Sequence, residues 1–193
     1  MRKDLGSLAT VFPMPVVVVA AYDAAGNPNM MTAAWSMICD YGKVAVFVDR
    51  THKTMQNILE TKAFTINIAN LENMAVTDYA GTATGNDTPD KFTCSGLHET
   101  KSKYVNAPVI QEYPLTLECD LAEIIDTENM YAMIGRIVNT SAEEAALDGS
   151  GKVDPAKLHA LIFDPFQNGY YVVGEKVGQA WEAGKLLMKE DDA

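Results

Sequence analysis

The stretch Leu115-Thr-Leu-Glu-Cys-Asp-Leu121 decides the fold class of this chain. Apolar and polar residues alternate strictly along it, which is the pattern of a strand with one buried face. Further strand-like runs lie on both sides of it, at 16–21, 44–49, 63–69, 131–138, 158–163 and 170–173. Many short strands separated by turn residues predict a mainly β fold, and we expect a closed antiparallel barrel.

Helical patterns are few. Residues 54–61 and 71–80 are expected to be helical, and 143–147 is expected to form one turn. The pattern at 176–188 permits a further helix, interrupted near its two glycines. Because helices and strands do not alternate regularly, a doubly wound parallel sheet is disfavoured.

Composition limits the possible partners and the compartment. The chain has 193 residues, 48% of them hydrophobic, and a formal net charge of −11, so nucleic acid and acidic membranes are disfavoured as partners. No apolar run approaches the ~20 residues that a membrane helix needs. Cys39, Cys94 and Cys119 contain no Cys-x-x-Cys pair, and each is expected to be a small buried residue. We therefore expect a soluble, cytoplasmic protein without disulfides.

Familiar catalytic and nucleotide motifs are missing from the sequence. It contains no Gly-x-Gly-x-x-Gly, no phosphate-binding Gly-x-x-x-x-Gly-Lys motif and no Gly-x-Ser-x-Gly. His52, His98 and His159 have no close partner at the spacing of zinc ligands. Hydrolase and metalloenzyme functions are therefore disfavoured, and we expect no metal.

The first candidate binding segment follows a buried strand and a turn. It consists of Asn29, Met30, Met31, Thr32, Ala33, Ala34, Trp35 and Ser36. Its small residues would let a flat ligand approach the backbone, whose N–H and C=O groups can bond the polar edge of a ring, with Trp35 as an apolar wall. The alternative is an ordinary strand with one core tryptophan.

The second candidate segment, residues 49–54, leads into a helix. Thr51 or Thr54 is expected to cap that helix. The helix N-terminus, the two hydroxyls and the neighbouring Arg50 and Lys53 suit a phosphate group. The alternative is a capped surface helix beside two solvated basic residues.

The third candidate segment is the loop at 81–90, which is followed by Lys91 and Phe92. The Lys91 ammonium would reach a phosphate, and Phe92 would anchor the loop in apolar surface. The alternative is a surface loop with a solvated lysine.

Motifs along the chain resemble those of the flavoredoxin branch of the flavin-reductase-like, FMN-binding split-barrel family. They occur in the family's order, and their spacing covers most of the chain. They are Pro15-Val-Val-Val-Val-Ala20, Gly26-Asn-Pro-Asn29, Thr32-Ala-Ala-Trp-Ser36, Phe64-Thr-Ile-Asn-Ile68, Asp90-Lys-Phe92, Leu117-Glu-Cys119 and Tyr170-Tyr-Val-Val-Gly174.

The resemblance implies a single domain over residues 1–193 with a Greek-key antiparallel split β-barrel and short α-helices. It also implies a homodimer with FMN near the interface. Residues 29–36 would contact the isoalloxazine and ribityl groups, and the ribityl-phosphate end would be served by Arg50, Thr51, Thr54 and Lys91. Where some relatives carry an Asp-His pair, this chain has Asn129-Met130, so a histidine contact is not carried over.

The function implied is that of an FMN-binding oxidoreductase, in which the flavin carries the redox chemistry and the protein orients and tunes it. It would pass electrons as a flavoredoxin does, with a redox-protein partner, or act as an NAD(P)H-linked flavin reductase. A non-catalytic flavin-binding or sensor module is the alternative. A third hypothesis is a structural barrel with a degenerate site. The resemblance leaves open the roles of Met130 and Tyr131, and an approach of Phe163 or Phe166 to the flavin.

Overall fold

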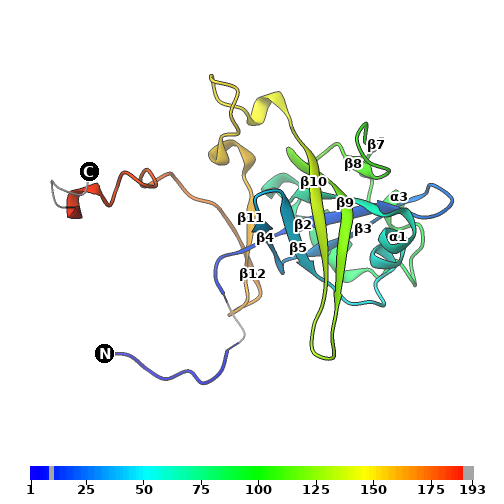
Figure 1. Cartoon of the computed structure of the whole chain (residues 1–193), viewed down its shortest axis with the longest axis horizontal. Coiled ribbons are helices and arrows are strands. Elements are labelled where there is room, and N and C mark those ends of the chain that lie inside the picture. The colour runs from blue at the N-terminus through cyan, green and yellow to red at the C-terminus, as the bar shows by residue number, and fades with distance from the viewer. Residues whose placement is uncertain (9–10, 189–193) are drawn as a thin grey trace.

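The computed structural model of the chain describes residues 1–8 and 11–188. The strands are β1 (Met14–Pro15), β2 (Val17–Tyr22), β3 (Pro28–Ala33), β4 (Ser36–Asp40), β5 (Lys43–Phe47), β6 (Ala63–Ile68), β7 (Glu99–Lys101), β8 (Pro108–Ile110), β9 (Leu115–Asp126), β10 (Tyr131–Ala142), β11 (Leu161–Asp164) and β12 (Gly169–Val172). The helices are α1 (Lys53–Thr61), α2 (Met74–Thr82) and α3 (Lys91–Cys94). Short 3-10 turns lie at Leu71–Asn73, Glu144–Ala146, Pro155–Leu158 and Lys185–Leu187. Figure 1 shows one body with the two ends of the chain extending from it.

A seven-stranded sheet forms the body, and every pairing in it is antiparallel, which confirms the predicted fold class. Its order is β3-β2-β6-β9-β10-β5-β4, so β3 and β4 are its two edges. Only residues 34 and 35 separate these strands along the chain. The sheet must therefore curl until its edges approach each other, as in a barrel.

The expected closure of that barrel does not occur. No ladder of hydrogen bonds joins β3 to β4 in the part of the chain that the structure describes. The two strands meet at the short link between them and are otherwise unpaired with each other. The barrel is consequently split along the segment 29–36, which forms both sides of the opening.

The polar face of β9 is buried, contrary to the simple alternation of its sequence. Glu118 is only 3% exposed and accepts hydrogen bonds from Ser102 and from Asn139, the latter at 2.6 Å. The hairpin of β7 and β8 packs beside this face. The polar residues of β9 thus face the β7–β8 hairpin rather than water, and this hairpin forms a second layer on the sheet.

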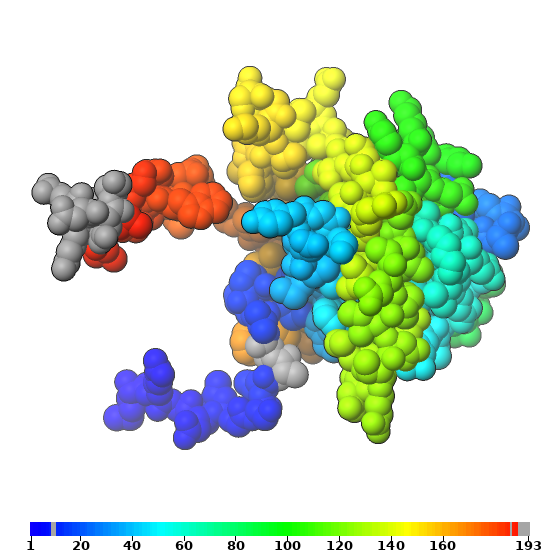
Figure 2. All heavy atoms as spheres, viewed as in Figure 1, coloured from blue at the N-terminus to red at the C-terminus, as the bar shows by residue number. Residues whose placement is uncertain are grey.

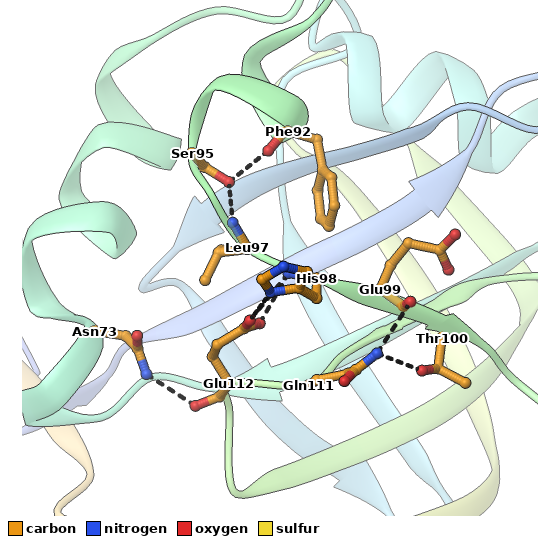
Figure 3. Close-up of polar contacts among 9 residues, drawn as sticks. All are labelled: Asn73, Phe92, Ser95, Leu97, His98, Glu99, Thr100, Gln111 and Glu112. Atoms are coloured by element: carbon orange, nitrogen blue, oxygen red, sulfur yellow. Dashed lines mark hydrogen bonds and ion pairs between the residues drawn. The ribbon is translucent and has the colours of Figure 1, made fainter.

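Polar contacts around Glu112 fix that hairpin (Figure 3). The His98 ring Nδ1 lies 2.7 Å from a Glu112 carboxylate oxygen, and the Asn73 side-chain amide donates to the Glu112 carbonyl at 2.8 Å. Gln111 donates to Thr100 across the hairpin at 2.7 Å. The start of α2 is thereby tied to the second layer.

The core fills the inside of the curled sheet. Phe64 on β6 is fully buried and stands against Gly135 on β10, where an added Cβ would lie 2.4 Å from the Phe64 ring. Side chains from β2, β5 and α1 complete the cluster, among them Val19, Val46 and Ile58. A glycine is required at 135 because the phenyl ring occupies the space of any side chain there.

The predicted helices at 54–61 and 71–80 are confirmed, the second as a 3-10 turn followed by α2. The turn predicted at 143–147 is also present, at Glu144–Ala146. An α-helix over 176–188 does not form; residues 176–179 have no regular structure, 180–184 form turns, and Lys185–Leu187 form a 3-10 turn. Two glycines and the absence of packing leave too little to stabilise a helix there.

Cys119 is buried as expected, and burial raises the pKa of its thiol to about 12. The expectation was wrong for Cys39 and Cys94, which are both exposed. Cys39 lies on the edge strand β4, and Cys94 ends the single turn of α3, so neither has a covering layer. Among the described residues, no helix is long and apolar enough to span a membrane.

Candidate functional site

The segment 29–36 runs along β3, through the link, and into β4. Asn29, Met30 and Ala33 are buried, whereas Met31, Thr32, Ala34 and Ser36 are half-buried. Trp35 is 61% exposed. The alternative of an ordinary strand with one core tryptophan is therefore wrong. The segment therefore presents backbone and one indole at the split of the barrel.

A pocket of about 790 Å³ opens beside this link. Ala34, Trp35 and Ser36 form one wall, and residues 47–49 and 129–131 line other parts of it. The lining is mostly apolar and includes the rings of Phe47 and Tyr131. Its volume falls within the range of about 300–1,000 Å³ that small-molecule sites occupy.

A second pocket of about 250 Å³ lies on the other side of Ala34, the one residue that lines both. Thr32 from β3, Asp78 from α2 and Phe163 from β11 contribute to it. Tyr170 on β12 closes one side and donates to Asp78 Oδ1 at 2.9 Å. Burial and the neighbouring carboxylate raise the pKa of Tyr170 to about 12, so this hydroxyl stays protonated at neutral pH.

The three predicted binding segments meet at Asn29. The Thr54 hydroxyl donates to Asn29 Oδ1 at 2.7 Å, so the start of α1 abuts β3. Gly85 in the loop lies so close that an added Cβ would be 2.6 Å from the Asn29 side-chain nitrogen. Asn86 donates to the Thr51 carbonyl at 2.9 Å. The loop at 81–90 is therefore folded onto β3 and the start of α1.

The N-terminus of α1 lacks the predicted cap. His52 is the N-cap residue, and no side chain of the described chain accepts a hydrogen bond there. The predicted caps are engaged elsewhere, because the Thr51 hydroxyl donates to Asp49 at 2.7 Å and that of Thr54 donates to Asn29. The first-turn N–H groups of α1 are thus left without a side-chain acceptor, which favours an anion at this helix end.

Lys91 is a buried cation. Its side chain is 2% exposed, and its ammonium donates to the carbonyls of Ala80 and Ala83 at 3.0 and 2.7 Å. It forms no ion pair with any carboxylate of residues 1–8 and 11–188. Burial lowers the pKa of Lys91 from 10.5 to about 8. The alternative of a solvated lysine is wrong, and one of its three protons remains available.

The structure does not bring Arg50 to the other basic residues. Its guanidinium donates to Asp126 on the β9–β10 hairpin and lies 5.1 Å from the centre of the Tyr131 ring. Both contacts hold it against the β9–β10 hairpin. Through Tyr131, Arg50 instead borders the larger pocket.

The larger pocket is also lined by residues outside the three candidate segments, among them Pro13, Met37 and Phe47. The one usable signal was that Phe47 lies in the predicted strand at 44–49, which leads directly into the candidate segment at 49–54. Phe163 lies in the smaller pocket, whereas Phe166 packs on Phe12 with ring centres 6.1 Å apart. Within the described residues, no group of three or more side chains is arranged to hold a metal ion.

Comparison with known proteins places the chain among flavin-binding folds. Residues 8–163 match the family model described as the flavin reductase like domain. A protein of Aquifex aeolicus (strain VF5), named only as uncharacterized, is 30% identical over 167 residues, which span 80% of this chain and 82% of that one.

Solved structures show the same fold. The flavoredoxin of Desulfovibrio vulgaris (Miyazaki F) is 34% identical, covers 95% of this chain and 100% of its own, and superposes with a TM-score of 0.90. The flavoredoxin from Methanosarcina acetivorans is 27% identical, with coverages of 97% and 100% and a TM-score of 0.87. A Shewanella frigidimarina protein with a split barrel domain has a TM-score of 0.76 at 20% identity, with coverages of 86% and 84%. The open, curled sheet is thus a split barrel.

Proposed function

The chain belongs to the flavin reductase-like family, and from that premise we propose that it binds FMN and transfers electrons through it. The family binds flavin. FMN is an elongated ligand with a flat, largely apolar ring at one end and a phosphate at the other. A site for it therefore needs an apolar slot and a cationic end, joined by a stretch of accessible backbone.

The single observation that carries the proposal is the buried ammonium of Lys91. A buried charge without a counter-ion is costly, and a phosphate would supply both the charge and the missing acceptor. Lys91 follows the loop that folds onto Asn29 and Thr54, beside the uncapped end of α1. The chemistry of this donor set fits a phosphate dianion.

The other end of the ligand fits the split of the barrel. Ala34 has a side chain small enough for a ring to approach the backbone, and Trp35 beside it offers an exposed apolar face. FMN would supply reversible hydride and electron transfer. The chain's own residues would hold the ring, exclude water through the apolar lining and bond the ring's polar edge through the backbone.

Among flavin functions, we favour that of a flavoredoxin, a bound-FMN electron carrier with a redox-protein partner. The two structures that superpose most completely among those described above are both named flavoredoxins, at 34% and 27% identity. The proposal extends to the whole chain, residues 1–193, as one cytoplasmic homodimeric domain. The alternatives are an NAD(P)H-linked reductase and a non-catalytic flavin sensor, and the reduction experiment below distinguishes them from a flavoredoxin.

The test is a titration of the purified chain with FMN, followed by visible absorption and flavin fluorescence. Bound FMN should show resolved bands and quenched emission, and Trp35→Ala should weaken binding about tenfold, because an aromatic contact contributes about 1 kcal/mol. Tyr41→Ala is the matched control, since Tyr41 is fully exposed and lies outside both pockets.

Reduction of the complex then separates the reactions. Rapid oxidation of NADH or NADPH without a protein partner would indicate a flavin reductase. Slow oxidation, together with fast reduction of the bound FMN by a low-potential redox protein, supports the flavoredoxin function. Bound FMN that no donor reduces would indicate a sensor. An FMN titration without any spectral change would reject all three.

A further inference from the structure

His52 begins α1 and also lines the larger pocket, where its side chain is half-buried. Its carbonyl accepts a hydrogen bond from the backbone N–H of Gln56 in the first turn of the helix, at 3.1 Å. Two further hydrogen bonds join it to Asp49. The backbone N–H of Asp49 donates to His52 Nδ1 at 3.2 Å, and the backbone N–H of His52 donates to the Asp49 carbonyl at 3.2 Å. The imidazole is thereby fixed against the turn that follows β5.

The contact with Asp49 determines where the neutral imidazole carries its proton. A backbone N–H can only donate, so Nδ1 accepts and the proton of the ring lies on Nε2. No hydrogen bond joins His52 Nε2 to another residue within the described residues 1–8 and 11–188. A donor without a protein partner, on a half-buried ring in the wall of a pocket, is available to a ligand.

His52 lies between the two ends of the proposed flavin site. The ring end is bounded by Ala34 and Trp35, which line the same pocket. The first-turn N–H groups of α1, which have no side-chain acceptor, follow His52 directly in the chain. The β9–β10 hairpin projects from the body beside β5 and borders the pocket through Tyr131 (Figure 2). A ligand with its ring in the apolar slot and its phosphate at the start of α1 therefore passes His52 with its middle section.

The neighbouring polar side chains do not supply a donor for that section. The backbone N–H and the hydroxyl of Thr51 donate to Asp49 Oδ1 at 2.8 and 2.7 Å. These hydrogen bonds hold the pKa of Asp49 below its ordinary range, so the carboxylate stays charged and cannot donate. The guanidinium of Arg50 donates to Asp126. The middle section of FMN is a ribityl chain, whose hydroxyl oxygens accept hydrogen bonds, and the Nε2–H of His52 is the donor that matches it.

We propose that His52 is a binding residue of the flavin site and that its Nε2–H donates a hydrogen bond to a ribityl hydroxyl of FMN. The backbone N–H of Asp49 holds the ring in the tautomer that can donate. This role accounts for a histidine at the start of α1, where serine, threonine, aspartate or asparagine is preferred for capping alone. The proposal rests on the proposed function, because it names one contact of the same FMN.

Two substitutions separate the roles of the two ring nitrogens. His52→Gln places an amide N–H close to the position of Nε2 but leaves no acceptor at that of Nδ1. His52→Asn keeps an acceptor for the Asp49 N–H but is too short to donate into the pocket. His52→Asn should raise the FMN dissociation constant about fivefold, and His52→Gln should stay within about twofold of the wild type.

Stability should follow the opposite order. In urea denaturation His52→Gln should be less stable than His52→Asn, because the Asp49 N–H loses its acceptor and asparagine is the better cap. His98→Asn is the matched control for FMN binding, since His98 lines neither pocket. Equal FMN affinities of the two His52 variants, or stronger binding by His52→Asn than by His52→Gln, would overturn the proposal.

Three flavins locate the contact on the ligand. Riboflavin keeps the ribityl chain without the phosphate, and lumiflavin keeps only the ring. His52→Asn should weaken FMN and riboflavin by the same factor and leave lumiflavin unchanged. A loss for FMN alone would place the contact at the phosphate, and an equal loss for all three would place it at the ring. Either result would overturn the assignment to the ribityl chain.

Nitrogen-15 NMR of the imidazole reads the contact without any turnover. The chain has three histidines, and the resonances of His52 are identified by their absence in His52→Asn. Nε2 should be protonated and Nδ1 unprotonated, and the Nε2–H resonance should shift when FMN is added. An unchanged Nε2–H resonance in the FMN-saturated chain would overturn the contact and leave the proposed function intact. A wild-type chain that binds no FMN would overturn both.

Discussion

Replacing Lys91 by methionine gives the sharpest test of the phosphate site, because the structure predicts how FMN affinity depends on pH. Burial lowers the pKa of Lys91 from 10.5 to about 8. At about 1.4 kcal/mol per pH unit, the buried ammonium costs the ligand-free fold about 3 kcal/mol at neutral pH. A phosphate beside it would remove that penalty and return the pKa to its ordinary range or above.

The sign of the effect follows from proton linkage. The folded, ligand-free chain has the lower pKa, so its stability is reduced below pH 8 and recovers as the pH rises toward 10.5. FMN would bind the protonated form and take up about half a proton at pH 8. Between pH 7 and 9.5 the protonated fraction of Lys91 falls about 30-fold, so the FMN dissociation constant should rise about 30-fold.

The assay is calorimetry at several pH values, with two buffers of different ionisation enthalpy at pH 8 to count the proton. Lys91→Met should bind FMN about 10- to 100-fold more weakly at pH 7, because a charge-assisted hydrogen bond contributes about 1.5–3 kcal/mol. Its affinity should not vary with pH over this range. Lys101→Met, on the exposed strand β7, is the matched control and should behave as the wild type.

Riboflavin lacks the phosphate, so comparing it with FMN isolates the contribution of the Lys91–phosphate contact to binding. Its affinity should be the same for the wild type and Lys91→Met. The reasoning is refuted if FMN affinity is independent of pH up to 9.5, or if Lys91→Met weakens riboflavin and FMN equally.

Two further predictions concern the framework that holds the site. Gly135→Ala should lower the free energy of unfolding by about 1–3 kcal/mol, because the new methyl group overlaps Phe64, whereas Gly42→Ala has open space and should change it little; urea denaturation measures both. Thr54→Val should destabilise the chain by about 1–3 kcal/mol by leaving Asn29 Oδ1 buried without its donor, and Thr54→Ser should restore most of it. Equal stabilities of the valine and serine variants would contradict this role.

Much of the architecture was predictable because it depends on short-range patterns. The alternation in residues 115–121 and the apolar run at 16–21 predict strands from side-chain spacing alone. These strands are present, as is the turn between β2 and β3. The order of the binding motifs along the chain likewise predicted the family, which the comparisons confirm.

Two predictions of local structure were wrong, the cap of α1 and the helix over 176–188. Thr51 is a reasonable helix cap by residue type, but its hydroxyl donates a hydrogen bond to the carboxylate of the neighbouring Asp49 instead. The contact of Arg50 with Asp126 on the β9–β10 hairpin could not be read from the sequence, because it joins residues far apart in the chain, and the phosphate role of Arg50 stays a prediction. Residues 176–188 permit a helix, but nothing in the body packs against them to stabilise one.

The segment 29–36 illustrates the division between sequence and structure. Its small residues and its tryptophan identify it as a candidate site because those properties belong to the residues themselves. That it forms both edges of a split barrel follows from the pairing order β3-β2-β6-β9-β10-β5-β4, which joins strands far apart in the chain. The burial of the Lys91 ammonium likewise follows from packing that brings α2, α3 and β3 together. Side-chain periodicity is local and can be read along the chain, whereas desolvation of a charge depends on every neighbour in space, and only the tertiary structure decides it.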